Sequence, residues 1–212
     1  MIQVNLSADY HSQRNNLLLP LETCGATAAV MALKASGWPV PPGARGAQPE
    51  DLLTAIMMSP EGYARREAIP GTWADTIEPY RIHVVLEWAI NKWIGKPVDT
   101  FTERGELQDM VWRILHRRAT VVNGLFDRYD HQVAVVGFTS TQHEYEIHTP
   151  GHVDLSRITD IIIDDPYGDY RTGYSEANGN DVRLPLDEFK AITHIQGEDQ
   201  KWMHLIERGP LT

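Results

Sequence analysis

The segment ETCGATAAVMALKAS, residues 22–36, predicts the first helix of the chain and contains the only cysteine. Five of its residues are alanines, and alanine has the highest helix propensity. Thr23 is expected to be the N-cap residue, and Gly37 is expected to end the helix in a left-handed conformation. The pattern therefore predicts a helix over residues 24–36 with a thiol in its first turn.

Cys24 is the only cysteine among 212 residues, which excludes an intramolecular disulfide and a cysteine-rich zinc site. The free N–H groups and the dipole of a helix N-terminus lower the pKa of a thiol, and the same N–H groups can bind an oxyanion. Gly25 would let a substrate carbonyl approach the backbone closely. From this segment alone, Cys24 is either a nucleophile or a small buried apolar residue.

Helices are predicted before residue 119 and strands after it. Apolar periodicity and capping residues predict helices at 50–58, 80–94 and 106–118, separated by an irregular stretch at 59–80. Runs of β-branched and aromatic residues predict strands at 120–125, 131–138, 144–148, 158–164 and 201–207, with a hairpin turn at 139–142 and a short helix at 186–192. This order indicates an α+β protein, and we expect one domain over residues 1–212. A helical lobe at about 20–118 would pack against an antiparallel sheet at about 119–212.

Three further residues have the chemistry that a catalytic thiol needs. His131 begins an apolar strand and could act as the base, and Asp165 follows another apolar strand and could orient the imidazole. Asp164 is the alternative carboxylate, because neighbouring side chains of a strand point to opposite faces. Gln13 could donate its side-chain amide to an oxyanion. Each residue also has an ordinary interpretation, as a strand end, a turn before a proline or part of a polar terminal segment.

Four segments in order resemble the peptidase C39-like group of papain-fold cysteine peptidases. They are SQRNN (residues 12–16), TCGATAAVM (23–31), DHQVAVVGF (130–138) and DDPYG (164–168). The resemblance implies a papain-like fold that needs no cofactor. It also implies Cys24 as nucleophile, His131 as base, Asp165 as orienting carboxylate and Gln13 as oxyanion donor.

The resemblance implies hydrolysis of peptide or amide bonds, and a stand-alone enzyme of this size could cut the cross-linking peptides of peptidoglycan, as phage lysins do. Two alternatives stay open on the same fold. One is a binding module without catalysis, and the other is an acyltransferase in which an amine takes the acyl group.

Composition excludes several other classes of function. The formal net charge of −10 argues against general nucleic-acid binding, and no 18-residue apolar run predicts a membrane span. The first residues lack the pattern of a signal peptide, which predicts a cytoplasmic protein or one released without a Sec signal. No metal site is predicted. His143 and His148 would face opposite sides of a strand, and the spacing of Asp164, Asp165 and Asp169 is not that of an EF-hand.

Overall fold

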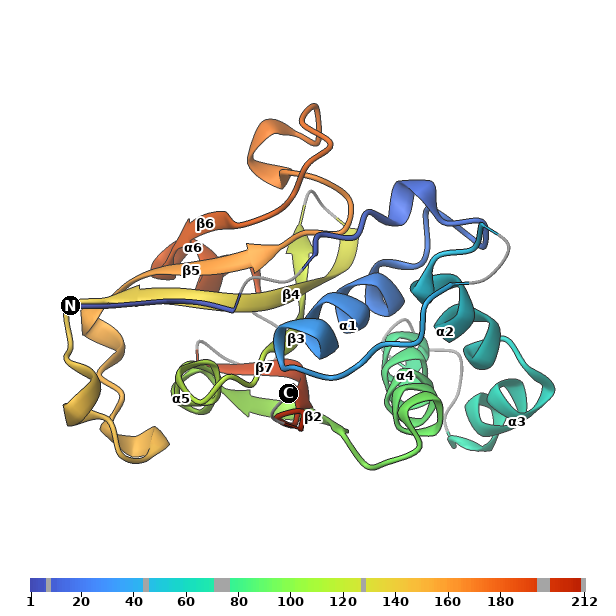
Figure 1. Ribbon diagram of the computed structural model, residues 1–212, viewed down its shortest axis with the longest axis horizontal. Helices are drawn as coiled ribbons and strands as arrows, with labels where there is room; N and C mark the ends of the chain where they lie inside the picture. Colours follow the sequence, from blue (N-terminus) through green and yellow to red (C-terminus); the bar gives the residue numbers. More distant parts are fainter. Residues whose placement is uncertain (7–8, 44–45, 71–76, 127–128, 194–198, 211–212) are drawn as a thin grey trace.

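The computed structural model describes residues 1–6, 9–43, 46–70, 77–126, 129–193 and 199–210. In this part of the chain, helices accompany a seven-stranded antiparallel sheet (Figure 1), which confirms the α+β class. The helices are α1 (Cys24–Ala35), α2 (Pro49–Met57), α3 (Pro60–Ala68), α4 (Ile77–Ile94), α5 (Leu107–Leu115) and α6 (Leu186–Ile192). The strands are β1 (Ile2–Asn5), β2 (Asp99–Glu106), β3 (Thr120–Phe126), β4 (Tyr129–Ser140), β5 (Ile158–Asp164), β6 (Val182–Pro185) and β7 (Gln200–Ile206). The strand order is β2-β7-β3-β4-β5-β6, and β1 pairs with β4.

Helix α1 is almost entirely enclosed. All residues from Gly25 to Leu33 are buried, as expected for a helix that is apolar on every side. It packs against β4 and, away from the sheet, against α2 and α4 (Figure 1). Gly37 has a φ of 84°, which confirms the predicted left-handed end. The thiol therefore begins a rigid helix in the middle of the molecule.

Strand β4 is the strand nearest to that helix and has neighbours along both edges. β5 pairs with residues 134–140 of β4 on one edge, and on the other edge β3 pairs with residues 129–135 and β1 with residues 137–140. Residues 131–138 of β4 are all buried. Backbone pairing on both edges, together with this burial, holds the start of β4 in a fixed position over the first turn of α1.

The expectation that the sheet lies within residues 119–212 is wrong. β1 and β2 come from earlier parts of the chain, and β2 pairs with β7, which lies between β2 and β3. The buried apolar cluster accordingly runs from Ile2 of β1 to Ile206 of β7. Strand β2 was missed because its DTFTERGE sequence is polar and alternates weakly, and its pairing with β7 spans about half the chain.

The expectation of an irregular stretch at 59–80 is wrong for its first half, where α3 forms. Ser59 caps this helix by accepting a hydrogen bond from the Gly62 N–H, and Pro60 occupies its first position, where a proline fits because no donor is needed. The next helix, α4, begins at Ile77 and contains Pro79 in its first turn for the same reason. Residues 71–76 lie outside the described residues.

The predicted strand at 144–148 and its hairpin are also wrong. Glu144–Glu146 forms a turn of 3-10 helix in which the His143 N–H donates to the Glu146 carboxylate at 2.6 Å. β4 pairs with β5 instead, so the segment between them has no strand partner. Helix α5 also ends earlier than predicted, at Leu115, because Arg117 adopts a left-handed φ of 60°.

Candidate active site

Cys24 is the first residue of α1 and is half-buried. Thr23 occupies the N-cap position as predicted, but its side chain makes no capping bond, and its hydroxyl accepts from the Asn16 amide at 2.8 Å. Without a capping side chain, the N–H groups of the first turn are left for the thiol or for a ligand.

The surroundings of the Cys24 sulfur favour a thiolate. Burial alone raises the pKa of the thiol, but a hydrogen bond from His131, the charge of that ring and backbone N–H groups of Gln132 and Gly25 lower it. The net pKa is below the ordinary value of 9.0. A lowered pKa is typical of reactive thiols, whereas the pKa of an inert core cysteine is raised.

His131 lies between the thiol and a carboxylate. Its Nε2 is 2.7 Å from Oδ1 of Asp165, and both side chains are buried. Burial alone lowers the pKa of His131, but the hydrogen bonds and charges of Asp165 and Cys24 raise it to about 10. Because a carboxylate only accepts, Nε2 carries the proton of that bond, and Nδ1 is the nitrogen left for the thiol.

The turn that follows β5 aims Asp165 at the histidine. The same Oδ1 accepts from the Tyr167 N–H at 2.9 Å, and the Asp165 N–H donates to the Gly179 carbonyl at 2.9 Å. A Cβ on Gly179 would lie 2.2 Å from the Asp165 carbonyl, so only glycine permits this approach. The turn around Gly179 thus supports the carboxylate directly.

Asp164 points away from the histidine, as the alternation of a strand requires. Its Oδ1 accepts from the Asp181 N–H at 2.9 Å. Burial raises the pKa of this carboxyl to about 7. The structure therefore brings Cys24, His131 and Asp165 together and leaves Asp164 outside the group.

Gln13 is buried beside this group, but no hydrogen bond of the described residues joins it to Cys24. Its backbone N–H donates to the Pro166 carbonyl at 2.9 Å, next to Asp165, and its side-chain Nε2 donates to the Pro20 carbonyl at 3.0 Å. An amide nitrogen carries two hydrogens, so one N–H of Gln13 is left for another acceptor.

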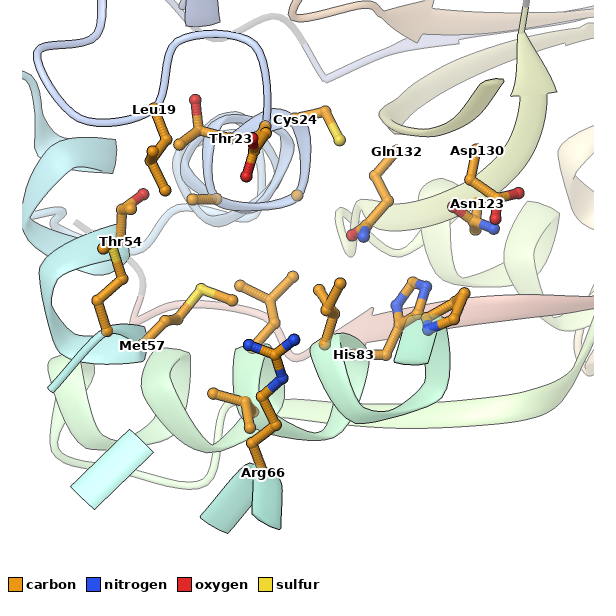
Figure 2. Close-up of a pocket in the computed structure, with 18 of the residues that line it drawn as sticks. Leu19, Thr23, Cys24, Thr54, Met57, Arg66, His83, Asn123, Asp130 and Gln132 are labelled. Carbon is orange, nitrogen blue, oxygen red and sulfur yellow. The ribbon is translucent and has the colours of Figure 1, made fainter. Parts of the chain in front are cut away.

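A pocket of about 570 Å³ opens beside the sulfur (Figure 2). Figure 2 shows Cys24 at the edge of the pocket, with Thr54 and Met57 of α2 on one side and Gln132 of β4 on the other. Most of the wall is apolar, and several large side chains of this wall are exposed: Leu19, Leu21, Met58, Tyr63 and Ile82. An exposed apolar hollow of this kind fits a ligand side chain.

Gly25 lets Gln132 reach into this pocket. A Cβ at position 25 would lie 2.6 Å from Oε1 of Gln132, closer than any ordinary contact. The glycine after the cysteine was expected to admit a substrate carbonyl, and the structure shows that it admits a neighbouring side chain. Gln132 itself was missed by the sequence reasoning, because in the sequence it is one polar residue among the apolar residues of a strand.

The pocket wall was also missed. It combines residues of α1, α2, α3 and α4 with residues of β3 and β4, and no local sequence signal links these elements. His83 of α4 is 1% exposed and lies in the pocket wall. Only the tertiary structure brings it near the thiol.

The sequence also raised the questions of a metal site and of a membrane span. Within the described ranges, no three His, Cys, Asp or Glu side chains are placed to hold a metal ion. His143 and His152 lie next to or within 3-10 turns rather than on a strand. None of the described helices is long and apolar enough to span a membrane.

The fold and this site are those of a candidate hydrolase. Comparisons with known proteins show which family of hydrolases it is. The sequence matches the model of the Peptidase_C39 like family over residues 5–189, so the chain belongs to this family of peptidases. The search of curated proteins found no match.

A solved structure shares the fold. The crystal structure of a protein described as a C39-like peptidase from Bacillus anthracis is similar with a TM-score of 0.56 at 14% sequence identity. The similarity covers 99% of this chain and 100% of that one. At this level of identity the comparison supports the arrangement of helices and strands, and the roles of individual residues depend on the geometry of this chain.

Proposed function

We propose that this protein is a cysteine peptidase of papain-like fold, with Cys24 as nucleophile, His131 as general base and acid, and Asp165 as the carboxylate that orients His131. The observation that carries the proposal is the 2.7 Å hydrogen bond from His131 to Asp165, beside a thiol whose pKa the same histidine lowers. A nucleophile, a base within reach and a third group that orients the base are the requirements of nucleophilic catalysis.

The first half of the reaction forms an acyl-enzyme. His131 holds the proton of Cys24 on Nδ1, and the thiolate sulfur attacks the carbonyl carbon of a peptide bond. The carbon–sulfur bond forms as the carbonyl π electrons move to oxygen. When the carbonyl re-forms, the carbon–nitrogen bond breaks and His131 gives its proton to the leaving amine.

The negative oxygen of the intermediate needs donors that are already in place. The backbone N–H of Cys24, in the uncapped first turn of α1, is one such donor. The second N–H of the Gln13 amide is the other. Loss of one such donor typically raises the barrier by about 3 kcal/mol.

The second half releases the acyl group. Water gives a proton to Nδ1 of His131 and attacks the thioester carbon, the carbon–sulfur bond breaks, and the thiolate and imidazolium are restored. Asp165 keeps Nε2 protonated throughout, so that Nδ1 is always the nitrogen that accepts and returns the proton.

The pocket argues for a peptide substrate with a bulky side chain near the scissile bond. Its apolar wall and its volume of about 570 Å³ suit such a group. The cross-linking peptides of peptidoglycan carry mostly small side chains and would leave the pocket largely empty. Cleavage of a protein with bulky side chains can therefore be compared with cleavage of peptidoglycan.

The test is to incubate the protein with casein and, separately, with purified peptidoglycan, and to identify new amino termini by mass spectrometry. We expect new termini from casein with the wild-type protein and none with Cys24→Ala. Circular dichroism of the variant would confirm that it is folded. Full activity of Cys24→Ala would contradict the proposal, and new termini from peptidoglycan alone would redirect it to a lysin.

Two controls separate the alternatives on the same fold. Addition of hydroxylamine shows whether an amine competes with water for the acyl group, as it would in an acyltransferase. The rate of Cys24 alkylation by iodoacetamide near pH 6 separates a peptidase from a binding module. A thiolate reacts at that pH, whereas a thiol of ordinary or raised pKa does not.

A further inference from the structure

A second chain of buried polar groups ends at the pocket wall. Nδ1 of His204 on β7 lies 2.6 Å from Oδ2 of Asp99 on β2, and Nε2 of the same ring lies 3.0 Å from Nδ1 of His83 on α4. All three residues are at most 3% exposed. None of them takes part in the proposed reaction, so the chain needs a separate explanation.

The hydrogen bonds of this chain determine which nitrogen of His83 carries a proton. Asp99 accepts from the Nδ1–H of His204, so the Nε2 of a neutral His204 is an acceptor. His83 must then donate its own Nδ1–H to that nitrogen, which leaves a bare lone pair on Nε2 of His83. Burial holds the pKa of His83 well below its ordinary value of 6.5, which keeps the ring neutral.

Rigid packing holds the His83 ring in place. The ring stacks on Phe101 with centroids 4.7 Å apart, and it contacts Trp202 edge to face at 5.3 Å. Its Nε2 is buried and has no hydrogen-bond partner among the residues that the structure describes. Figure 2 shows the ring standing above α4 and facing Asn123, Asp130 and Gln132 across the pocket. A buried acceptor without a partner is destabilising until a donor reaches it.

The same pocket contains a second such acceptor, which is Oε1 of Gln132. The side of the pocket near His83 therefore offers acceptors, while the side near Met57 offers apolar surface. Among the described residues, no carboxylate is hydrogen-bonded to Nε2 of His83, and a cation buried against this nitrogen without a counter-charge would be strongly unfavourable. A neutral donor on an apolar body matches this wall better than an ammonium group does.

We propose that His83 is a specificity-determining residue, whose Nε2 accepts a hydrogen bond from a neutral donor on the substrate side chain that fills the pocket, such as a tyrosine hydroxyl or a tryptophan indole N–H. Asp99 and His204 are positioning residues that fix the tautomer of His83. The inference rests on the proposed function, since it names the kind of side chain that the peptidase recognises.

The first experiment measures selectivity with a peptide library whose cleavage products are identified by mass spectrometry. At one position near the scissile bond, tyrosine and tryptophan should exceed phenylalanine and leucine by at least about tenfold in kcat/KM, because an analogue without the hydroxyl leaves the acceptor unpaired. In His83→Phe the ratio of tyrosine to phenylalanine should fall to about one. The exposed residue His116 provides the matched control His116→Phe, in which the ratio should not change.

A second variant keeps the test decisive if His83→Phe does not fold. Asp99→Asn can donate to His204, which allows both rings to adopt the other tautomer and lets His83 present an N–H. The preference for tyrosine should be lost, while the rate of Cys24 alkylation stays as in the wild type. An unchanged preference in both variants, or a preference for lysine in the wild type, would overturn the proposal.

The third measurement does not depend on activity. Nitrogen-15 NMR at pH 7.5 should show that Nδ1 of His83 is protonated and Nε2 is not, and the Nε2 resonance should move on addition of N-acetyl-tyrosinamide but not of N-acetyl-phenylalaninamide. A protonated Nε2, or equal responses to the two amides, would refute the inference. Absence of cleavage together with the expected NMR result would refute the peptidase alone.

Discussion

Nε2 of His131 lies 2.7 Å from Oδ1 of Asp165, although 34 residues separate the two in the sequence. The strands β4 and β5 that carry them are paired, and Ala134 lies opposite Asp164 in the register. Asp165 directly follows that pair and lies in the turn that Pro166 continues, where it faces the ring. The paired strands and this turn together align the base with its carboxylate.

Replacement of that carboxylate is expected to reduce activity much more than replacement of its neighbour. Asp165→Asn removes the charge that keeps His131 protonated and oriented, and kcat/KM should fall by roughly 10²–10⁴-fold, the range of general acid–base effects. Asp164→Asn makes the same chemical change one residue earlier, on the opposite face of the strand, and should retain activity. Peptide hydrolysis by both variants checks this, and equal losses would mean that the turn rather than the charge matters.

The pH dependence of the thiol is a separate prediction. Between the lowered pKa of Cys24 and the raised pKa of His131, about 10, the pair exists as thiolate and imidazolium. Alkylation of Cys24 should therefore rise with a midpoint below 9.0, and peptidase activity should decline near pH 10 as His131 loses the proton that the leaving amine needs.

The matching variant for this profile is His131→Ala. Without the imidazole, burial is left as the main influence on the thiol, so the alkylation midpoint should move upward. His143→Ala, at an exposed histidine, serves as the control and should leave the midpoint in place. An alkylation profile identical in wild type and His131→Ala would show that the ring does not affect the pKa of the thiol, and it would contradict the proposed pair.

Local signals account for the parts of the fold that the sequence predicted well. Helix α1 was predicted to within one residue, and the bounds of β5 and α6 match their predicted ranges. Their own residues favour the observed structure: alanines favour a helix in α1, and isoleucines favour a strand in β5. Cys24 and Asp165, two of the candidate site residues, could be recognised in the sequence for the same reason, because one begins a regular element and the other follows one.

Long-range pairings account for what was missed. The polar strand β2 becomes a strand only because β7 pairs with it, and His83 meets His204 across 121 residues of sequence. Helix α3 was missed for a different reason: Pro60 is typical of a turn or loop, but it also suits the first position of a helix. The catalytic roles of Cys24, His131, Asp165 and Gln13 stay predictions until the variants are assayed.

Gly25→Ala should separate activity from stability. The new Cβ would lie 2.6 Å from Oε1 of Gln132, the mobile end of a flexible side chain, so the amide can rotate away while the backbone stays in place. Alanine also has up to about 1 kcal/mol higher helix propensity than glycine, so the thermal midpoint should stay equal or rise. Activity should nevertheless fall about tenfold or more, because the displaced amide takes up space beside the thiol that the substrate needs.

The double variant Gly25→Ala/Gln132→Ala tests the cause of that loss. Removal of the Gln132 side chain frees the space that the new Cβ needs, and part of the activity should return. Gln132→Ala alone measures the contribution of the amide itself. No recovery in the double variant would show that the glycine is required by the substrate or by the backbone, and not by Gln132.

Asp164 makes a prediction about stability that is independent of catalysis. Burial raises its pKa from 3.8 to about 7, so between these values the folded protein binds a proton that the unfolded chain does not. The stabilising contribution of this carboxyl is complete below about pH 4 and is lost as the pH rises to 7, with a slope of up to about 1.4 kcal/mol per pH unit.

Asp164→Asn, which is neutral throughout, should lack this component. Urea unfolding at several pH values should therefore show the wild type losing stability relative to Asp164→Asn between pH 4 and 7, and no further change above it. Asp187→Asn, at an exposed carboxyl, should follow the wild type, and parallel curves for all three proteins would mean that Asp164 is ionised in the folded state.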